Sequence, residues 1–563
     1  MILESQAKTS ALYMNPNRKV AVLDYNKKYV TDIFSLLDSS ELAQVVTDFL
    51  AEQGHSESDN DFNNVTADQY VQTIQKVLLD QKNAYDNYSR TDILASIEKL
   101  YSFYRSFLRI SVLNKEGNDA ANTFISLDNN FNDLVLQLYR TVEEKLQGFP
   151  NHTYRQVNAG TSAAALIKKH DVKLPAQYDA LKDIPFLNTL MLRPPMMITT
   201  PSNKRKGVFS AVDYNPVDHF NAYQDQEWFC YPAKIGESLA FIYFHRDYFA
   251  AGISLANLFE VASADEVKNK KPDLVLLFGL KHTEGEVSHY HHDAENNIWV
   301  GEVPYNDDTT YFGYMKKMCL TLHNLHMIYQ NSLPIHGSMV RIKFSNGKEK
   351  SVVFFGDSGA GKSESIEALQ EVADDKIISI ETIFDDMGSF TLKDGELYAQ
   401  GTEIGAFVRL DDLSSAVAFN NMDRGIYLNP DQKNARVIIP ANTYANVVAP
   451  HHVDMWVYAN NYDNEIGIHR FDDKAAAKKT FVDGRRNALG TTDEVGMSTT
   501  FFANPFGPVQ EPERTQPVID EVFDWFFNHD TYIGEIYTHL GNDKSKNSLQ
   551  ESAKALLDQL MNS

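Results

Sequence analysis

The sequence has few cysteines and fewer basic than acidic residues. Cys230 and Cys319 are the only cysteines among 563 residues, which excludes a disulfide framework and a thiolate metal cluster. The 52 Lys and Arg residues against 76 Asp and Glu residues give a formal net charge of −24. Because nucleic acids and anionic membranes attract basic surfaces, this charge predicts no nucleic-acid partner and no membrane partner. A local basic site could still hold nucleotide phosphates.

Long apolar runs are also missing. The N-terminus, MILESQAKTS, lacks the basic segment and apolar run of a secretory signal. No stretch approaches 18 uninterrupted apolar residues, which excludes an ordinary transmembrane helix, and we expect a cytoplasmic protein. The 43% hydrophobic and 12% aromatic residues nevertheless suffice for globular cores, and the length predicts two or three domains.

Residues 1–150 show helical periodicity. Thr66 could cap a helix that carries Val71, Ile74 and Val77 on one side, and the same spacing recurs over residues 93–108 and 131–142. No catalytic pattern stands out here. We therefore expect an N-terminal helical accessory region that ends near residues 148–151 and could serve as a surface for a protein partner.

Short β-rich runs follow this region. Residues 240–244, 274–278 and 298–303 predict strands in a second region, residues 151–330. In a third region, residues 331–563, two apolar runs at 340–344 and 351–355 flank Asn346-Gly347, which is typical of a tight hairpin. A further strand is expected at 455–459 and a helix from Pro517. Mixed strands and helices predict an α/β (α+β) fold.

A phosphate-binding loop follows the second hairpin strand. The pattern Gly-four residues-Gly-Lys-Ser lies between a predicted strand and a predicted helix, the context of a nucleotide-binding P-loop (Walker A motif). Glycines expose backbone amides to phosphate oxygens, Lys362 can neutralise the terminal phosphates, and the Ser363 hydroxyl can ligate Mg²⁺. The loop residues are Gly356, Asp357, Ser358, Gly359, Ala360, Gly361, Lys362 and Ser363.

Two adjacent carboxylates follow an apolar run downstream of the loop. Asp385 and Asp386 come after Ile377, Ile378, Ile380 and Ile383. A carboxylate pair at a strand end after a P-loop suits a metal ion or a base near a transferred phosphoryl group. An isolated Asp-Asp pair is more often a solvated turn, but the upstream P-loop favours a site.

These segments resemble a known group of P-loop enzymes. The loop GDSGAGKSE and the carboxylate pair resemble phosphoenolpyruvate carboxykinases and HPr kinase/phosphorylase. Tyr311-Phe-Gly-Tyr-Met-Lys-Lys317 resembles the YGGEMKK segment of ATP-type carboxykinases, and Leu333-Pro-Ile-His336-Gly-Ser338 resembles their MHCSAN segment. Lys317 and His336 are 19 residues apart, as in that family. The resemblance, over roughly residues 230–510, implies a two-lobed, mixed-sheet carboxykinase-like fold.

The resemblance also implies roles for individual residues. Lys317, His336 and Asp386 would hold a transition metal such as Mn²⁺, with Lys317 made neutral by the metal and by neighbouring Lys316. Ser363 would hold the Mg²⁺ that accompanies ATP or a related nucleotide. Lys362 and Arg436, in a segment similar to the family's NTR…YP, would stabilise the phosphoryl group in flight. Arg436 would also contact the substrate, and Tyr311 would line the carboxyl-group site.

Some family features are missing. The GRSPKDK motif, whose arginine binds the substrate carboxylate, is not readable, and Arg155 and Arg193 are candidates for that task by position only. Thr492–Ser498 lacks the arginine of the family's TERGITEP segment, whereas Gly401–Gly405 and Asn504–Gly507 lie where the family has its EGGCYAK run and an aromatic segment near the adenine. His289–Asp293 and His451-His452 are interpreted as surface loops.

The pattern leaves three functions open. An ATP- and metal-dependent carboxykinase (a lyase of gluconeogenesis) would convert oxaloacetate, a small carboxylate, to phosphoenolpyruvate by decarboxylation and phosphoryl transfer, and it needs the lysine-histidine pair. A kinase related to HPr kinase would phosphorylate a protein or small-molecule hydroxyl, with Asp385 or Asp386 as general base. A nucleotide-sensing scaffold would use the N-terminal helices to bind a partner.

Overall fold

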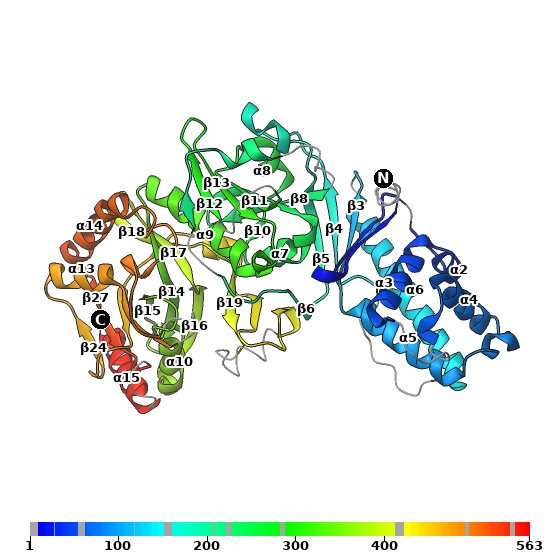
Figure 1. Cartoon of the computed structure of the whole chain (residues 1–563). Helices are drawn as coiled ribbons and strands as arrows, with labels where there is room; N and C mark the ends of the chain where they lie inside the picture. The colour runs from blue at the N-terminus through cyan, green and yellow to red at the C-terminus, as the bar shows by residue number, and fades with distance from the viewer. Residues whose placement is uncertain are drawn as a thin grey trace.

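The computed structural model describes residues 10–27, 29–54, 62–117, 119–150, 160–205, 209–220, 227–281, 288–410, 422–489, 495–540 and 546–562. The fold is α/β with mixed sheets, as the sequence predicts. The molecule is elongated (Figure 1): a group of helices lies at one end, a large sheet follows, and a second large sheet with its helices lies at the other end.

The first large sheet extends from the N-terminal strands to the middle of the chain. Its central strands β9, β11 and β13 are parallel, whereas hairpin partners such as β8 and β9 are antiparallel. The order across the sheet is β1 (Leu12–Asn15), β2 (Val20–Asp24), β3 (Leu108–Asn114), β4 (Ala163–Lys168), β5 (Phe186–Leu192), β8 (Trp228–Ile235), β9 (Ser238–His245), β11 (Leu274–Leu280), β13 (Ile298–Pro304), β12 (His289–Asp293) and β7 (Ser210–Ala211), with β10 (Glu260–Val261) beside β8.

The helices predicted from the spacing of apolar residues in the N-terminal region are present. Thr66 caps α4 in a capping box, and residues 131–142 lie in α6. Helix α5 ends earlier than its spacing suggests, because Leu108 begins strand β3, which pairs with β2 and β4. Residues 1–150 therefore hold strands as well as helices, and one sheet continues past residue 150. The helices are α2 (Ile33–Leu37), α3 (Ser40–Gln53), α4 (Ala67–Leu78), α5 (Arg90–Arg105) and α6 (Ala120–Gln147).

The second large sheet forms around the long strand β14. The hairpin prediction is confirmed: β14 and β15 are antiparallel, and Gly347 in the turn has the positive φ of +84° that glycine tolerates. The order is β22 (His451–His452), β18 (Glu396–Gly401), β17 (Met387–Lys393), β14 (Leu333–Phe344), β15 (Glu349–Phe355), β23 (Met455–Asn460), β27 (Tyr532–Tyr537) and β24 (Ile468–Arg470), with β16 (Ile377–Phe384) also on β14.

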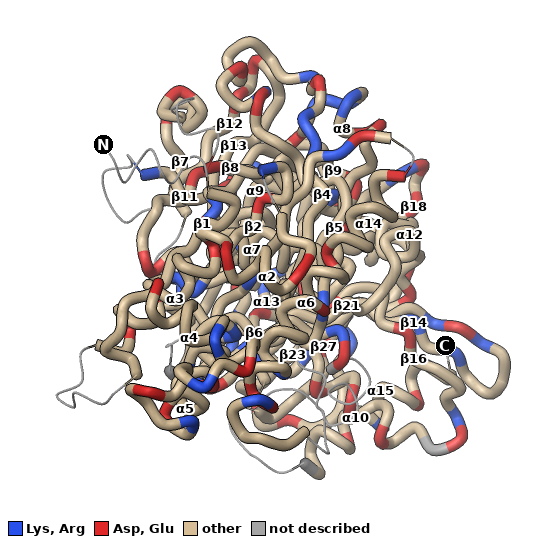
Figure 2. Tube along the Cα trace, turned by 90° about the vertical axis from the view of Figure 1, so that its right-hand side faces the viewer, with Lys and Arg blue, Asp and Glu red and all other residues tan. Residues whose placement is uncertain are grey.

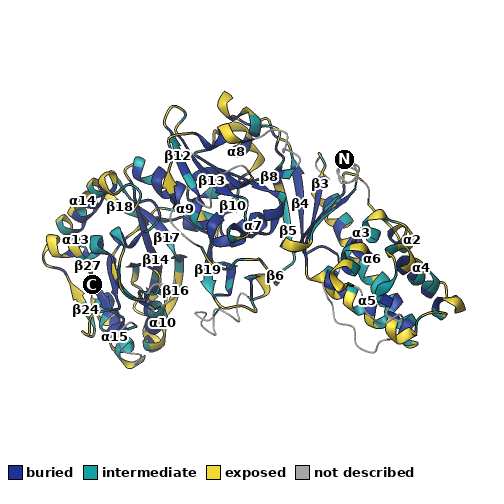
Figure 3. Cartoon of the chain, in the orientation of Figure 1, coloured by how far each residue is buried: buried dark blue, intermediate teal, exposed yellow. Residues whose placement is uncertain are grey.

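Helices and two small sheets complete the fold. In Figure 3 the strands of both large sheets are mostly buried, whereas the outer faces of the helices are exposed. The small sheets are β19 (Gly405–Arg409), β21 (Arg436–Pro440), β20 (Ile426–Leu428) and β6 (Met196–Ile198), and β25 (Arg485–Leu489) with β26 (Val495–Thr499). The remaining helices are α7 (Phe249–Ser254), α8 (Ala264–Asn269), α9 (Phe312–Tyr329), α10 (Lys362–Val372), α12 (Tyr444–Val447), α13 (Lys474–Asp483), α14 (Pro512–Asn528) and α15 (Lys546–Asn562).

The negative charge is distributed over the molecule. Figure 2 shows Asp and Glu residues on all parts of the chain, interspersed with Lys and Arg. None of the helices in the described residues is long and apolar enough to cross a membrane.

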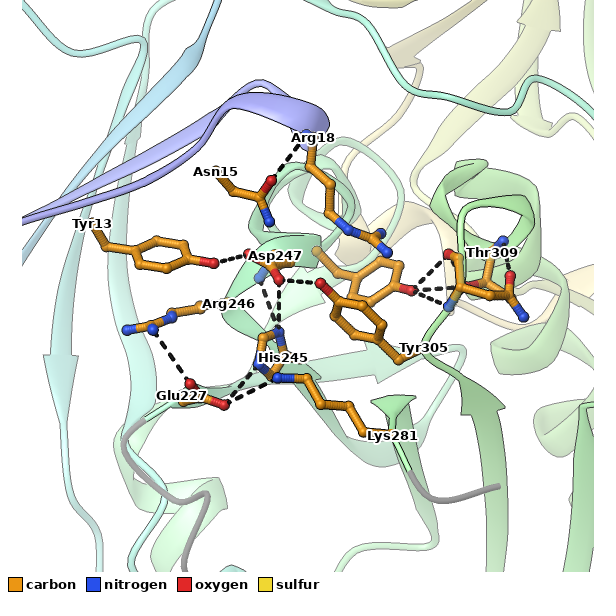
Figure 4. A network of polar contacts seen from close by, with 12 residues as sticks. Tyr13, Asn15, Arg18, Glu227, His245, Arg246, Asp247, Lys281, Tyr305 and Thr309 are labelled. Atoms are coloured by element: carbon orange, nitrogen blue, oxygen red, sulfur yellow. Dashed lines mark hydrogen bonds and ion pairs between the residues drawn. The ribbon is translucent and has the colours of Figure 1, made fainter. Parts of the chain in front are cut away.

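A buried polar network ties the N-terminal strands to the carboxyl ends of β9 and β13 (Figure 4). Asp247 accepts hydrogen bonds from the hydroxyls of Tyr13 and Tyr305. Arg18 lies over the Tyr305 ring, 4.2 Å from its centroid. His245 accepts from the Asp247 amide (3.2 Å) at Nδ1, so its Nε2 donates to Glu227 (3.0 Å). The network thus joins elements that are more than 200 residues apart in the sequence.

Glu227 makes this network sensitive to acid. Its carboxylate lies 3.3 Å from Arg246 and 3.4 Å from Lys281, in addition to His245. The hydrogen bond from His245, together with these charges, lowers the pKa of Glu227 to about 2 from an ordinary value of 4.5.

Replacing Glu227 with Gln should therefore lower the free energy of unfolding near pH 6 by about 1–3 kcal/mol, the size of hydrogen bonds to a charged group. Because the folded-state pKa lies below the unfolded one, this difference is complete above about pH 4.5 and disappears as the pH falls toward 2. Thermal unfolding of both proteins from pH 7 to pH 3 measures it. The exposed Glu295→Gln variant is the control, and a difference that does not change with pH would contradict the prediction.

Candidate functional site

The site forms where β14 changes partners. The first part of β14 pairs with β17, placing His336 opposite Met387, and the second part pairs with β16, placing Met339 opposite Phe384. Asp385 and Asp386 therefore lie between these two strands, beside residues 337–338. The Gly337 amide donates to the Asp386 carbonyl (3.0 Å), and the Ser338 hydroxyl donates to the Asp385 carbonyl. Strand register thus fixes both aspartates next to His336.

Three cationic or imidazole side chains converge on the Asp386 carboxylate. Lys316 Nζ lies 2.8 Å and Lys317 Nζ 3.3 Å from Oδ2, and both lysines belong to α9. His336 Nε2 lies 3.1 Å from Oδ1. The structure therefore brings the predicted metal-binding residues Lys317, His336 and Asp386 together, although they come from three elements.

The charges of this cluster shift its proton affinities. Burial alone would raise the pKa of Asp386, but Lys316 and Lys317 hold it well below its usual range. Burial lowers the pKa of Lys317 to about 8, and the charge of Lys316 acts in the same direction. Burial opposes charge on Lys316 too, yet Asp386 and Glu403 raise its pKa. Lys316 therefore stays charged, whereas Lys317 can become neutral near physiological pH.

Glu403 is a second buried carboxylate of the cluster. It lies in the Gly401–Gly405 segment, 3.2 Å from Lys316 Nζ, and only 4% of its surface is exposed. Burial, opposed by Lys316, raises its pKa to about 7. The sequence showed the segment but did not indicate the carboxylate, since nothing in its spacing pairs Glu403 with Lys316.

The orientation of His336 fits a bound cation. Its Nδ1 lies 2.9 Å from the Ala503 carbonyl and 3.5 Å from Asp357, both acceptors, so Nδ1 must carry a proton. Its Nε2 faces the Asp386 carboxylate, another acceptor. Burial, together with the charge of Lys362, lowers the pKa of His336 and disfavours a second proton. A metal ion would resolve this conflict, because the Nε2 lone pair and the carboxylate could both bind it.

The P-loop follows β15 and is joined directly to this cluster. The Gly356 amide donates to the His336 carbonyl (3.1 Å). Gly361 has φ +106°, and a side chain there would meet Thr538 at 2.7 Å, so the turn into α10 requires glycine. Lys362 donates to the carbonyls of Gly356 (2.7 Å) and Asp357 (3.3 Å) and lies over the loop. Ser363 is exposed on the first turn of α10.

Asp357 places a negative charge within the phosphate-binding loop. An acid in a phosphate loop would repel phosphate, but Arg486 Nε lies 3.1 Å from its carboxylate and the Thr500 hydroxyl donates to it (3.2 Å). Arg486 also donates to the Ser358 carbonyl (2.5 Å). Arg486 was missed in the sequence because β25 lies more than 120 residues after the loop, and it supplies a cation next to Asp357.

Asp385 has a different environment from Asp386. Its carboxyl group is partly buried, and burial together with the neighbouring Asp386 charge raises its pKa. The two adjacent aspartates are thus pushed in opposite directions: Asp386 stays ionised, whereas Asp385 binds a proton more readily.

Tyr311 and Arg436 meet at one aromatic ring. The Phe407 ring lies 6.2 Å from the Tyr311 ring and 5.4 Å from the Arg436 guanidinium. Lys316 Nζ lies 5.4 Å from the same ring. The predicted substrate residues are therefore connected to the Asp386 cluster through Phe407.

Arg205 reaches the site from a segment that the sequence did not single out. Its guanidinium lies 5.7 Å from the centroid of the Phe506 ring, and Lys317 Nζ lies 4.4 Å from that centroid. Burial lowers the pKa of Arg205, and the nearby Tyr314 and Tyr311 act in the opposite direction. Its only signal in the sequence is the basic stretch at residues 204–206, which does not match the expected motif.

Of the two arginines that the sequence offered for the substrate carboxylate, only Arg193 lies in the described residues. Arg193 forms an ion pair with buried Asp128 (2.5 Å) and donates to Asn129 of α6 (2.8 Å), so its guanidinium is engaged there. Arg155 lies outside the described residues, as do residues 490–494.

The two histidine segments are strands rather than surface loops. His289–Asp293 forms β12, and His292 stacks on Trp299 (4.2 Å). Hydrogen bonds to Glu302 and to the Val212 carbonyl direct His289 and His291 to separate partners. His451, in β22, donates from Nε2 to the Asn446 carbonyl (2.7 Å). Neither segment belongs to a group of three or more possible metal ligands among the residues that the structure describes.

One family model matches part of the chain. The model described as Phosphoenolpyruvate carboxykinase matches residues 235–455, less than half of the chain. The matched range contains Tyr311, Lys317, His336, the whole P-loop, Asp386 and Arg436. Arg205, Arg486 and the N-terminal helices lie outside it.

Selective titration of Lys317 is the first test of this site. In ¹⁵N-lysine NMR spectra, Lys317 should titrate near pH 8 while Lys316 remains charged up to at least pH 10. In the Asp386→Asn variant the Lys317 midpoint should fall further, because the carboxylate charge that favours the ammonium is lost. The exposed Lys82 serves as the reference signal, and a Lys317 midpoint that rises in this variant would refute the assignment.

Proposed function

Residues 235–455 belong to the ATP-type phosphoenolpyruvate carboxykinase superfamily, and we propose that the protein converts oxaloacetate and ATP to phosphoenolpyruvate, CO₂ and ADP. The convergence of Lys317, His336 and Asp386 beside the P-loop carries this proposal. A simple kinase does not require a neutral lysine and a histidine around one carboxylate.

Lys317, His336 and Asp386 would hold a divalent metal such as Mn²⁺. Such an ion, when bound, polarises the substrate oxygen and offsets the negative charge that develops there. Two features of the chain favour metal binding: the pKa of Lys317 is lowered to about 8, and the proton of His336 is fixed on Nδ1, away from the metal side. Lys316 would stay charged and hold Asp386 in place.

Cationic side chains on the Phe407 and Phe506 side of the cluster would bind the substrate carboxylates. Arg436 lies against Phe407 and is oriented by two hydrogen bonds to Asn434 (2.9 and 3.2 Å). Arg205 lies near Phe506, close to Lys317. We assign to Arg205 the carboxylate-binding task of the missing arginine motif, because a guanidinium binds a carboxylate in two parallel hydrogen bonds.

The P-loop would bind the ATP phosphates. Its backbone amides and the α10 N-terminus favour anions, and Lys362 would exchange its carbonyl partners for the terminal phosphates. The exposed Ser363 hydroxyl would ligate Mg²⁺ that accompanies the nucleotide.

In the reaction the protein would act mainly by positioning the reactants and stabilising charge. Cleavage of the bond to the departing carboxylate releases CO₂ and leaves its electron pair on the enolate of pyruvate. The enolate oxygen attacks the γ-phosphorus of ATP, the bond to the bridging oxygen breaks, and ADP leaves. Lys362 and Arg436 would neutralise the charge on the phosphoryl group during transfer.

A second candidate rests on Asp385. Its raised pKa makes it a better proton acceptor than Asp386. A kinase that phosphorylates a hydroxyl group needs such a general base. A loop with Asp357, similar to that of HPr kinase, favours this alternative. Nucleotide binding without turnover of any substrate would instead support a nucleotide-sensing scaffold.

The direct assay incubates the protein with oxaloacetate, ATP, Mg²⁺ and Mn²⁺ and measures phosphoenolpyruvate. The wild-type protein should form it, and His336→Gln should lower kcat on the order of 100-fold or more, because loss of metal-site residues has effects of at least that size. His452→Gln, an exposed histidine of β22, should keep full activity. Absence of product from a protein that binds ATP would exclude the carboxykinase proposal.

Arg205 provides a more selective test. Arg205→Met should raise KM for oxaloacetate roughly 10–100-fold, since a hydrogen-bonded charge contact contributes about 1.5–3 kcal/mol, and should leave the Kd for ATP unchanged. Arg205→Lys should restore only part of the affinity, because an ammonium lacks the paired donors of guanidinium. Steady-state kinetics and ATP titration measure the two effects, and equal losses for both ligands would contradict this role.

A further inference from the structure

An apolar cavity lies between the N-terminal helices and the first strands. Its volume is about 150 Å³, and it is lined by residues of β1, β2, α3, α5 and α6. Two groups of packed apolar side chains meet there without closing the space. Leu42, Leu100, Val135 and Leu138 pack against these groups yet remain only partly buried. Interiors are normally close-packed, so a cavity of this size between two cores is available to a ligand.

Tyr101, a residue of the cavity wall, has a buried hydroxyl that lacks a partner in the part of the chain that the structure describes. Tyr101 is 8% exposed and stacks on Tyr139, with ring centroids 3.8 Å apart, and among the described residues its hydroxyl makes no hydrogen bond. Two neighbouring polar groups of the wall already have partners. Glu41 accepts from the Ala11 amide (3.0 Å), and the Tyr104 hydroxyl donates to the Gly160 carbonyl (3.1 Å). A buried hydroxyl without a partner is costly, so a ligand acceptor would be favoured at Tyr101.

We propose that this cavity binds a small neutral molecule: one aromatic ring or a short alkyl chain that carries a hydrogen-bond acceptor, to which Tyr101 donates. Cavities of about 150 Å³ lined by apolar side chains bind benzene-sized ligands. A charged ligand is disfavoured because burial of an ion is expensive, and an anion would also meet the acidic residues Asp24 and Glu41 of the wall. The site lies in residues 11–142, outside the matched range, and is separate from the proposed phosphoryl-transfer site.

An adjoining groove gives the ligand an exit to solvent. Tyr29 and Val30 border both the cavity and a polar groove of about 510 Å³, and Tyr29 is 49% exposed. Hydroxyl and amide side chains line the groove: Thr31, Asn122, Thr123, Ser126 and Asn130, with Asp119. A larger ligand could therefore place an uncharged polar end in this groove while its apolar part stays in the cavity.

Three probes of similar size test the proposal on the full chain: toluene, acetophenone and benzoate. Acetophenone adds a carbonyl acceptor to the ring, and benzoate replaces its methyl group with a charged oxygen. Titrations followed by methyl NMR shifts of the cavity leucines should give saturable binding of toluene. Acetophenone should bind about 10-fold more tightly, the effect of one added hydrogen bond, and benzoate should bind at least about 10-fold more weakly than toluene.

Two variants test the contribution of the Tyr101 hydroxyl to binding. Tyr101→Phe keeps the ring and its stacking on Tyr139, so toluene should bind as before while the advantage of acetophenone disappears. Tyr104→Phe removes a neighbouring hydroxyl that already has a partner and should leave the preference unchanged. No saturable binding of toluene or acetophenone by the wild-type chain would overturn the proposal. Retention of the acetophenone advantage in Tyr101→Phe would overturn the role of Tyr101.

Discussion

The attraction between Asp386 and the side chains of Lys316, Lys317 and His336 is the interaction on which the candidate site depends. Buried charges are stable only when they are paired, and here one carboxylate faces two ammonium groups and an imidazole. Lys316 is held a second time by Glu403, so it remains charged and keeps Asp386 ionised. Lys317 lacks this second carboxylate within ion-pair distance and has the lowered pKa. Two consecutive lysines thus acquire different chemistry from the number of carboxylates that surround them.

Strand register places this cluster next to the phosphate loop. Strand β14 pairs with β17, β16 and β15, so one strand carries His336 and holds both the aspartates and the strand that leads into the loop. The bond from the Gly356 amide to the His336 carbonyl joins the two parts directly. A change in register by one residue would turn His336 to the opposite face of the sheet and separate it from Asp386. The chemistry therefore depends on long-range pairing as much as on the local motifs.

The sequence predicted the features that are encoded locally. The P-loop, the Asn346-Gly347 hairpin and the helix capped by Thr66 each depend on residues a few positions apart, and the structure contains them. Lys317 and His336 could be identified only through the resemblance to a family, because nothing in their spacing shows that they meet. Glu403, Arg205 and Arg486 were missed, since they reach the site through tertiary packing. The strand β3 was hidden because its apolar run directly continues the spacing of α5.

Local charge balance explains how a chain with a net charge of −24 can offer a site for nucleotide and carboxylate anions. Three carboxylates near the phosphate loop are matched by cations: Asp357 by Arg486, Asp386 by Lys316 and Lys317, and Glu403 by Lys316. Among the described residues, Lys362 is held by neutral carbonyls and forms no ion pair. Arg436 likewise bonds to the neutral amide of Asn434. Lys362 and Arg436, whose hydrogen bonds within the described residues go to neutral groups, are therefore suited to meet incoming anions, whereas the paired cations fix the geometry of the site.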